Sequence, residues 1–227
     1  MAKKKLEENM NTGFIEAPPT PTDYIAGGET KIQYEVINKT GDWAAYLPSE
    51  ERQKFRNFDS MACVSFSACN SLETQLNFML TNNLVPKWLV NWLNVEGYID
   101  NKGKVNFSDR FIAKTSRTTE RGNNLQRVWD AIRHNGLVPE KDWPSSDEFS
   151  WLQYYALVEE NVINKGLESM KYLDVQYEWV YALDPIGAAI NFTHTDKELK
   201  HAPLQFASAT CPGWNDGKII QKCNRKA

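Results

Sequence analysis

Cys63 is the residue of this chain whose type and position best suit chemistry. It follows a polar, turn-like segment that begins at Asp59, and it precedes a stretch whose apolar residues recur every three or four positions. That spacing predicts a helix over residues 63–80, ended by Asn82 and Asn83. A thiol at a helix start faces unpaired backbone N–H groups and the positive end of the helix dipole, which favour the nucleophilic thiolate. The bare helix start also fits an inert core cysteine, so the neighbouring residues must decide between the two.

The three histidines do not complete a catalytic pair by their spacing. His134 stands at a predicted helix end, where its side chain interacts favourably with the helix dipole. His194 lies near a helix start and His201 precedes Pro203, and we expect both to be structural. A zinc site built from His194 and His201 would have no cysteine at ligand spacing. The sequence therefore indicates neither a metal site nor a cofactor.

Composition and charge bound the class of protein. The 227 residues, 41% of them apolar, suffice for one domain or for two lobes that share a cleft. A net charge of −3 leaves no basic footprint for nucleic acid. No apolar run approaches the ~20 residues of a membrane span. The basic start, Met1–Asn9, is followed by no apolar stretch, so we expect no secretory signal.

The four cysteines are too few for a disulfide scaffold in a chain of this length. A reducing compartment is the simplest inference. Cys69 lies six residues beyond Cys63, on another helical face, and is expected in the core. Cys211 and Cys223 flank a short strand-like run, where pairing across a hairpin and two separate thiols both remain open.

Three regions along the chain differ in composition and in expected secondary structure. Residues 1–30 form a polar, proline-containing arm; residues 31–166 hold one strand followed by a helical lobe; residues 167–227 are β-rich and look incomplete. The expected strands are 31–37, 172–182, 204–209 and 217–222, and the expected helices beyond the first begin at Pro86, Asn124, the capping-type run 145–148, and Thr195. The helix from Asn124 should end at Asn135–Gly136, and the one after 145–148 should end near Gly166.

The run Cys63–Ala68, CVSFSA, resembles the nucleophile segment of papain-like cysteine proteases, Cys-Trp-Ala-Phe-Ser-Ala. Further pieces similar to that family follow in its order, at 107–111, 121–125, 128–139, 143–144 and 198–206. Together they cover roughly residues 42–210, and the nearest resemblance is to the divergent members found in bacteriophage genomes. The resemblance implies an α+β fold, with a helical left lobe followed by a partial antiparallel β right lobe.

The resemblance also implies roles for individual residues. Cys63 would be the nucleophile, and its own N–H would supply half of the oxyanion hole. Asn57 stands where the family has its glutamine donor, with a side chain one methylene shorter. Gly122 and Asn123 would offer backbone hydrogen bonds to an extended substrate. Ser60 replaces the cysteine of a family disulfide, so that bridge cannot form.

The histidine half of such a site is missing from the expected order. In the family, the catalytic histidine follows the strand that corresponds to residues 204–209 by a few tens of residues, and this sequence ends at Ala227. We expect an N-terminal portion of a longer polypeptide, inactive or very poor on its own. A complete protein that kept the scaffold and lost the histidine remains the other explanation.

Three functions remain open from the sequence. The first is a papain-like cysteine peptidase acting on a polypeptide substrate. The second is a non-catalytic phage virion or assembly protein, whose arm and aromatic side chains contact other virion proteins. The third is a peptidoglycan amidase or endopeptidase of the NlpC or CHAP type, which is ranked lower because a block of helices follows Cys63. We expect the protein in the cytoplasm of the producing cell or in the virion.

Overall fold

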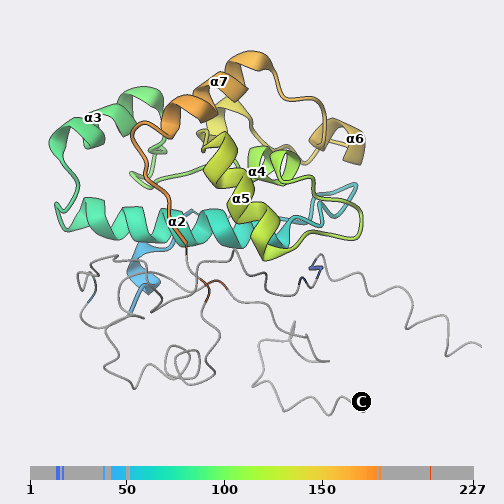
Figure 1. Ribbon diagram of the computed structural model, residues 1–227, viewed down its shortest axis with the longest axis horizontal. Helices are drawn as coiled ribbons and strands as arrows, with labels where there is room; N and C mark the ends of the chain where they lie inside the picture. The colour runs from blue at the N-terminus through green and yellow to red at the C-terminus, as the bar shows by residue number, and fades with distance from the viewer. Residues whose placement is uncertain are drawn as a thin grey trace, which may run out of the picture.

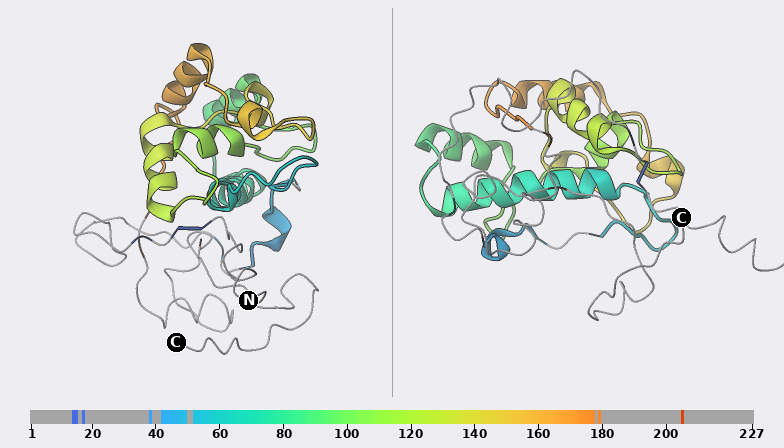
Figure 2. Two further views of the ribbon diagram at one scale, coloured as in Figure 1. Left: turned by 90° about the vertical axis from the view of Figure 1, so that its right-hand side faces the viewer. Right: turned by 60° about the horizontal axis from the view of Figure 1, so that its bottom comes forward.

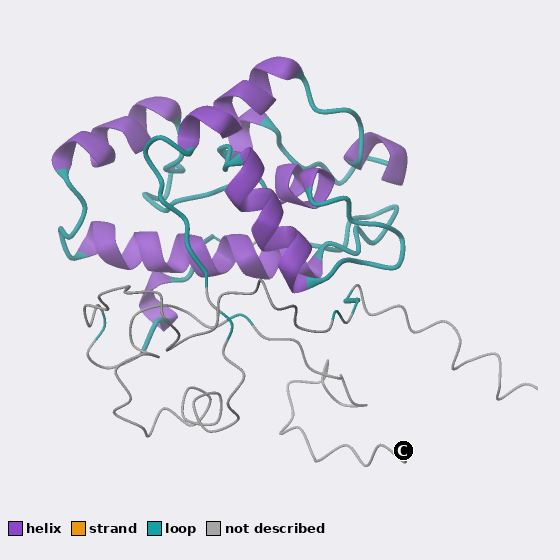
Figure 3. Cartoon of the chain, viewed as in Figure 1, coloured by secondary structure: helices purple, strands orange, loops and turns teal. Residues whose placement is uncertain are grey.

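Helices form nearly all regular structure in the computed structural model, which describes residues 14, 15, 17, 38, 42–49, 52–177, 179 and 205 (Figures 1 and 3). Two short 3₁₀ helices and six α-helices lie in this part: η1 Ala44–Tyr46, α2 Cys63–Thr81, α3 Lys87–Glu96, α4 Asp109–Thr115, α5 Leu125–Asn135, η2 Glu140–Asp142, α6 Trp151–Tyr154 and α7 Glu160–Ser169. None of the described helices is both long and apolar enough to cross a lipid bilayer.

The expected α+β fold is wrong for the described residues, which contain isolated β-bridges but no strand. The extended stretch before α4, where the sequence predicts no strand, shows how the backbone is satisfied here without a sheet. Two buried side chains of α2 accept its backbone N–H groups: Asn77 from Val105 (2.8 Å) and Glu73 from Phe107 (2.6 Å). These groups are therefore unavailable for a strand ladder.

The described residues of the expected β-rich lobe form no strand. Residues 173–177 are irregular, although they open the strand expected at 172–182. The strands expected at 31–37 and 217–222 and the helix expected at 195–200 lie outside the described residues, as does the strand at 204–209 apart from Gln205.

Helix α2 is the axis of the fold. It begins at Cys63 and ends at Thr81, one residue beyond the predicted range, and Asn83 then turns the chain with a φ of 56°. Helices α4 and α5 both pack on it, and α5 begins beside its N-terminal end (Figure 1). The main hydrophobic core lies between these helices and contains Val64, Ala68, Cys69, Phe107, Phe111, Ile112, Val128 and Ile132, among others.

The helix expected between 145–148 and Gly166 is two helices. Ser150 and Gln153 form a capping box that starts α6, and the chain leaves the helix at Tyr155. The carbonyls of residues 153–155 then accept hydrogen bonds from Arg110 and Lys114 rather than from a continuing helix. Helix α7 starts afresh at Glu160 and runs to Ser169, past the expected end.

Close backbone contact joins the end of α5 to α7. Gly136 ends α5 with a φ of 70°, as the sequence predicts for a glycine stop. A Cβ atom there would lie 1.8 Å from the Gly166 carbonyl oxygen, and one on Gly166 would lie 2.4 Å from the Asn135 carbonyl oxygen. Both positions therefore require glycine at this packing distance.

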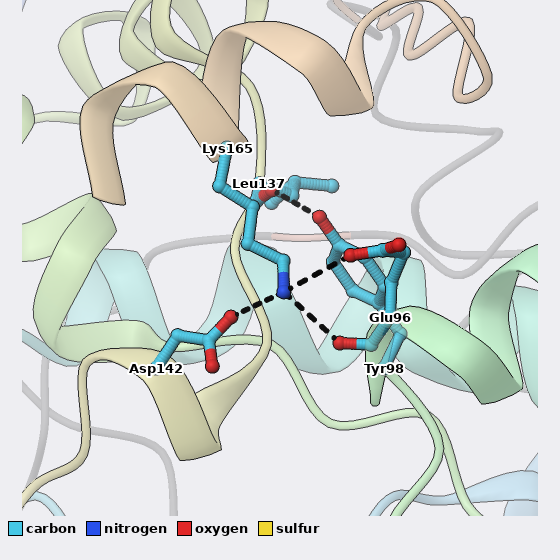
Figure 4. A network of polar contacts seen from close by, with 5 residues as sticks. All are labelled: Glu96, Tyr98, Leu137, Asp142 and Lys165. Carbon is cyan, nitrogen blue, oxygen red and sulfur yellow. Dashed lines mark hydrogen bonds and ion pairs between the residues drawn. The ribbon is translucent and has the colours of Figure 1, made fainter. Parts of the chain in front are cut away.

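A lysine connects three elements on the side away from Cys63. The Lys165 ammonium on α7 lies 2.6 Å from Asp142 Oδ2 and 3.2 Å from Glu96 Oε2, and it also donates to the Glu96 carbonyl at 3.1 Å (Figure 4). The neighbouring Tyr98 hydroxyl donates to the Leu137 carbonyl at 2.9 Å. The network therefore ties α7 to η2 and to the end of α3.

The buried Arg110 attaches the 143–155 segment to α4. Arg110 donates to three backbone carbonyls, those of Tyr154 (2.7 Å), Pro144 (2.9 Å) and Gln153 (2.5 Å). Its Cζ atom also lies 4.3 Å from the Trp143 ring centre and 4.6 Å from that of Phe149. Planar stacking with several directed hydrogen bonds is a combination that arginine provides and lysine does not.

Replacing Arg110 by lysine should therefore destabilise the fold. Arg110→Lys keeps the charge but cannot reach all three carbonyls or stack on both rings, and each hydrogen bond lost to a charged donor costs about 1.5–3 kcal/mol. We expect the free energy of unfolding in urea to fall by about 3 kcal/mol. The exposed Arg121→Lys is the matched control, and equal stabilities of the two variants would contradict this account.

Candidate active site

Cys63 is the first residue of α2, as the sequence predicts. The preceding turn is tight: Met61 has a φ of 54° and its N–H donates to Asp59 Oδ1 at 3.0 Å. The Ala62 N-cap supplies no side-chain acceptor to the first helical turn. The Cys63 side chain is partly buried and packs against the main core, so the sulfur lies at the edge of the interior rather than inside it.

The thiol is less acidic than the sequence suggests. Burial is the largest influence and raises the pKa of Cys63, and the nearby Asp59 carboxylate raises it further. The backbone N–H groups of Val64 and Cys63 lower the pKa, but by less. The expected helix-activated thiolate is therefore wrong for the described surroundings, in which the thiol keeps its proton at neutral pH.

Asn57 lies at an exposed turn ahead of Cys63. A bridge between Lys54 and Asp59 and a hydrogen bond from the Phe55 N–H to the Phe58 carbonyl (2.9 Å) close this turn. The Asn57 side chain is exposed and makes no hydrogen bond within residues 52–177. Its role as an oxyanion donor stays a prediction.

Gln53 is a second carboxamide in this region, and sequence reasoning missed it. Its Nε2 donates to Asp59 Oδ1 at 3.2 Å, and its carbonyl accepts from the Ser60 hydroxyl (2.9 Å) and N–H (3.3 Å). The closed turn therefore brings Gln53 into contact with Asp59 and Ser60, just before α2 begins. Lys54 and Asp59, opposite charges five residues apart around an Asn, were the available signal for such a turn.

The phenol of Tyr155, which is distant in the sequence, lies beside the segment that precedes Cys63. Its hydroxyl donates to the Ser60 carbonyl at 2.6 Å. Burial raises the pKa of Tyr155, the Thr118 hydroxyl lowers it, and the charges of Asp59 and Cys63 raise it further. The phenol therefore stays protonated and lies within electrostatic reach of the thiol. No local pattern marks a residue brought in across 95 positions.

Asn123 is fully buried and organises the loop behind this phenol. Its amide nitrogen donates to the Ser116 hydroxyl (2.8 Å), the Ser116 carbonyl (3.0 Å) and the Thr118 hydroxyl (3.0 Å). Gly122, with a φ of 93°, exchanges backbone hydrogen bonds with Thr119 (2.8 and 3.2 Å). The two residues expected to bind substrate thus lie together, with the Gly122 backbone groups already used inside a turn.

An extended piece of the chain itself lies on Asn123. Phe14 forms a parallel bridge with Asn123, and the Ile15 N–H donates to the Asn123 carbonyl at 2.7 Å. Phe14 also packs against the main core. The described pieces of residues 14–17 lie at the end of α2 that begins with Cys63 (Figures 1 and 2). The carbonyl expected to pair with a substrate is therefore occupied by the arm.

Among the described residues, no histidine takes part in the contacts around Cys63 given above. His134 lies exposed at the end of α5, where its Nδ1 lies 2.7 Å from the Asp130 carbonyl oxygen, which fits the predicted structural role. His194, His201, Cys211 and Cys223 lie outside the described part. Within that part, no cluster of three or more histidine, cysteine, aspartate or glutamate side chains has the arrangement of a metal site.

Comparison with known proteins leaves the family of this chain open. No family model, no curated protein and no solved structure matches it. The resemblance to papain-like proteases therefore rests on the sequence pieces alone and stays a prediction.

Removing the Asp59 charge should make Cys63 more reactive. Asp59→Asn keeps the acceptor oxygen for the Met61 N–H and removes a negative charge that raises the pKa of Cys63. The pH at which half of the thiol reacts should shift downward, and alkylation by iodoacetamide at pH 7.5 should speed up by about 2- to 10-fold, since one pKa unit changes the thiolate fraction tenfold.

Peptide mapping after alkylation assigns the rate to Cys63 and separates it from the other thiols. Asp147→Asn, at an exposed position, is the control and should leave the rate unchanged. An Asp59→Asn profile identical to that of the parent would show that the carboxylate does not act on the thiol.

Proposed function

We propose that the protein is a cysteine peptidase in which the Cys63 thiolate attacks the carbonyl carbon of an extended polypeptide. One observation carries the proposal. Cys63 opens a 19-residue helix, and an extended chain segment is hydrogen-bonded to Asn123 at that same end of the helix. A nucleophile and a place for an extended peptide backbone are the two parts that such an enzyme requires.

The first step of this chemistry uses groups that surround Cys63. The sulfur forms a bond to the carbonyl carbon, the carbonyl π electrons move to its oxygen, and the thiol proton goes to a base. The backbone N–H of Cys63 would donate to the resulting oxyanion. Gln53 and Asn57, which lie ahead of Cys63 in the segment that leads into α2, carry the carboxamides that we propose as a second donor.

The second step needs a proton donor. Collapse of the tetrahedral intermediate breaks the C–N bond and leaves an acyl thioester, and the departing amine must receive a proton. Tyr155 is held protonated beside the thiol but already donates to the Ser60 carbonyl. An imidazole from outside the described residues would take the thiol proton and return it to the amine.

The raised pKa of Cys63 fits a nucleophile that depends on such a base. An imidazole beside the thiol would take its proton and stabilise the thiolate as an ion pair. Acylation by an activated ester requires only the thiolate and the oxyanion donors, because a nitrophenolate leaves without being protonated. Ester acylation therefore tests the nucleophile separately from the proton donor of the second step.

The test is a burst experiment with the purified chain and a peptidyl p-nitrophenyl ester. We expect about one equivalent of nitrophenolate, an acyl group on Cys63 by mass spectrometry, and a rate per thiolate at least about tenfold above that of N-acetylcysteine. Amide bonds of the same peptide should be cleaved very slowly, if at all. A purified cell-wall preparation as second substrate covers the peptidoglycan alternative.

Two variants control this experiment. Cys63→Ser should lose the burst, and Cys69→Ala should keep it, since Cys69 is fully buried in the core. A burst that survives Cys63→Ser, or one no faster than the small thiol, would refute the peptidase proposal.

The arm segment at Asn123 should compete with a peptide substrate. Ile15→Pro removes the N–H that donates to the Asn123 carbonyl and leaves that carbonyl for another chain. We expect acylation by the peptidyl ester to rise about 3-fold or more, mainly through a lower KM. Ala17→Pro, at another described position of the arm, is the matched control.

The comparison with a small reagent interprets that result. Alkylation of Cys63 by iodoacetamide should change less than acylation by the peptidyl ester, because a small reagent does not pair with Asn123. An unchanged KM in Ile15→Pro would mean that the arm and the ester do not share a site.

A non-catalytic assembly protein is the second candidate, and two observations favour it. Large apolar side chains are exposed on the described surface, with Leu157 86%, Leu152 82% and Val95 69% accessible. The thiol also rests protonated. Under this alternative Cys63 shows no ester burst and alkylates no faster than N-acetylcysteine, so the same experiment decides between the two functions.

A further inference from the structure

Helix α7 exposes an apolar stripe along one side. Ile163, Leu167 and Met170 are 38%, 45% and 42% accessible, and spacings of four and three residues place them on one face of the helix. Each of them directly follows a residue that α7 buries. Single exposed apolar side chains are common on protein surfaces, whereas contiguous ones mark interaction sites.

The stripe points away from the elements that hold α7 in place. Lys165 binds α3 and η2, and it lies two residues from both Ile163 and Leu167. Residues two apart on a helix point to nearly opposite sides, because each residue turns the helix by about 100°. Helix α7 itself lies at the edge of the described part of the fold, away from α2 (Figures 1 and 2). The stripe therefore lies on a side of α7 that α3 and η2 leave open.

Opposite charges stand at the two ends of this stripe. The exposed Glu160 lies in the first turn of α7, and the exposed Lys171 follows the helix end, where its N–H donates to the Glu168 carbonyl at 3.0 Å. Glu160 and Lys171 are eleven positions apart, which is about three full turns, so both lie along the same edge of the stripe. One end of the surface is thus negative and the other is positive.

We propose that this side of α7 docks a second copy of the chain, with the two α7 helices packed antiparallel about a two-fold axis. Such a contact is self-complementary, since each copy offers the same surface to the other. The apolar stripe forms the centre of the contact, and the charges at its two ends form the rim. The inference does not depend on the peptidase proposal, because α7 lies away from the helix that begins with Cys63.

One register satisfies the apolar and the charged side chains together. Setting Ile163 level with Leu167 of the second copy also brings Glu160 to within one residue's rise, about 1.5 Å, of the level of Lys171, because the two pairs have nearly the same midpoint in α7. The two-fold axis repeats both pairs. In an antiparallel pair each edge of one helix meets the same edge of the other, so the two charges lie on the correct side for an ion pair.

The charges favour this occupant over others. Parallel helices would set Glu160 beside Glu160 and Lys171 beside Lys171, and like charges repel. The antiparallel arrangement pairs opposite charges and places the positive end of each helix dipole beside the negative end of the other. A uniformly acidic or basic helix from another protein would match one end of the surface and be repelled by the other end.

The contact is small, since it consists of one helix packed on one helix. Interfaces that bury less than about 1,200 Å² are typical of weak and transient complexes. We therefore expect a dissociation constant of about 10–100 µM for the dimer.

Sedimentation equilibrium of the full chain tests the docking. Between about 5 and 500 µM, with a reducing agent to prevent disulfides between copies, we expect a reversible change from monomer to dimer. Leu167→Lys places charges at the centre of the contact and should raise the dissociation constant about tenfold or more. Leu152→Lys, at an apolar residue that is 82% accessible but lies outside α7, is the matched control and should leave the constant unchanged.

A charge reversal distinguishes docking from folding. Glu160→Lys and Lys171→Glu each bring like charges together and should raise the dissociation constant about 3-fold or more. The double variant restores opposite charges and should return to within about 2-fold of the parent chain. Each single change also opposes the helix dipole, so the thermal midpoint of unfolding should fall in both variants and further in the double variant. Association that recovers while stability does not identifies a contact between copies.

The outcomes separate this proposal from the proposed function. A chain that stays monomeric at the highest concentration excludes a second copy as the occupant and leaves the stripe to a different protein. A dimer that Leu167→Lys does not weaken, or a double variant as weak as the single ones, would also overturn the docking. A parent chain that dimerises as expected but shows no ester burst would refute the peptidase and leave the docking surface in place.

Discussion

Two buried hydrogen bonds determine how the rest of the structure is arranged around α2. The carboxylate of Glu73 and the amide of Asn77 hold the backbone of Phe107 and Val105 against that helix. Their register sets where α4 begins, and α4 carries Arg110, which binds the 143–155 segment through its carbonyls. That segment in turn delivers Tyr155 to the turn before Cys63. The surroundings of the thiol therefore depend on polar groups inside the core, about 15 to 21 Å along α2 by its rise per residue.

The elements that the sequence predicts correctly are those with local causes. The start of α2 at Cys63, its stop before Asn83 and the bounds of α5 follow from apolar spacing, an N-cap asparagine and a glycine stop. The α+β expectation fails because the described residues of the strand expected from residue 172 are irregular and no other described segment forms a strand. The single helix up to Gly166 fails for a non-local reason, since Arg110 takes the carbonyls that would have continued it. The proposed division at residues 30 and 166 stays a prediction.

The candidate site contains residues that the sequence names and residues that it does not. Cys63, Asn57, Gly122 and Asn123 were named from the sequence, and their roles stay predictions. Gln53 and Tyr155 were missed, because a fold and not a spacing brings each of them to α2. The acidity of the thiol was misjudged for a related reason: the helix start is visible in the sequence, whereas the burial that outweighs it depends on packing.

The contacts of Arg110 with backbone carbonyls affect which sequence changes this protein can accept. The guanidinium binds main-chain oxygens, so the contact does not depend on which side chain stands at a position such as Pro144. Substitutions there preserve the bond provided that the backbone path is kept, whereas position 110 admits no replacement with the same planar donors. Among homologues, an invariant arginine facing a variable loop would be the evolutionary signature of this clamp.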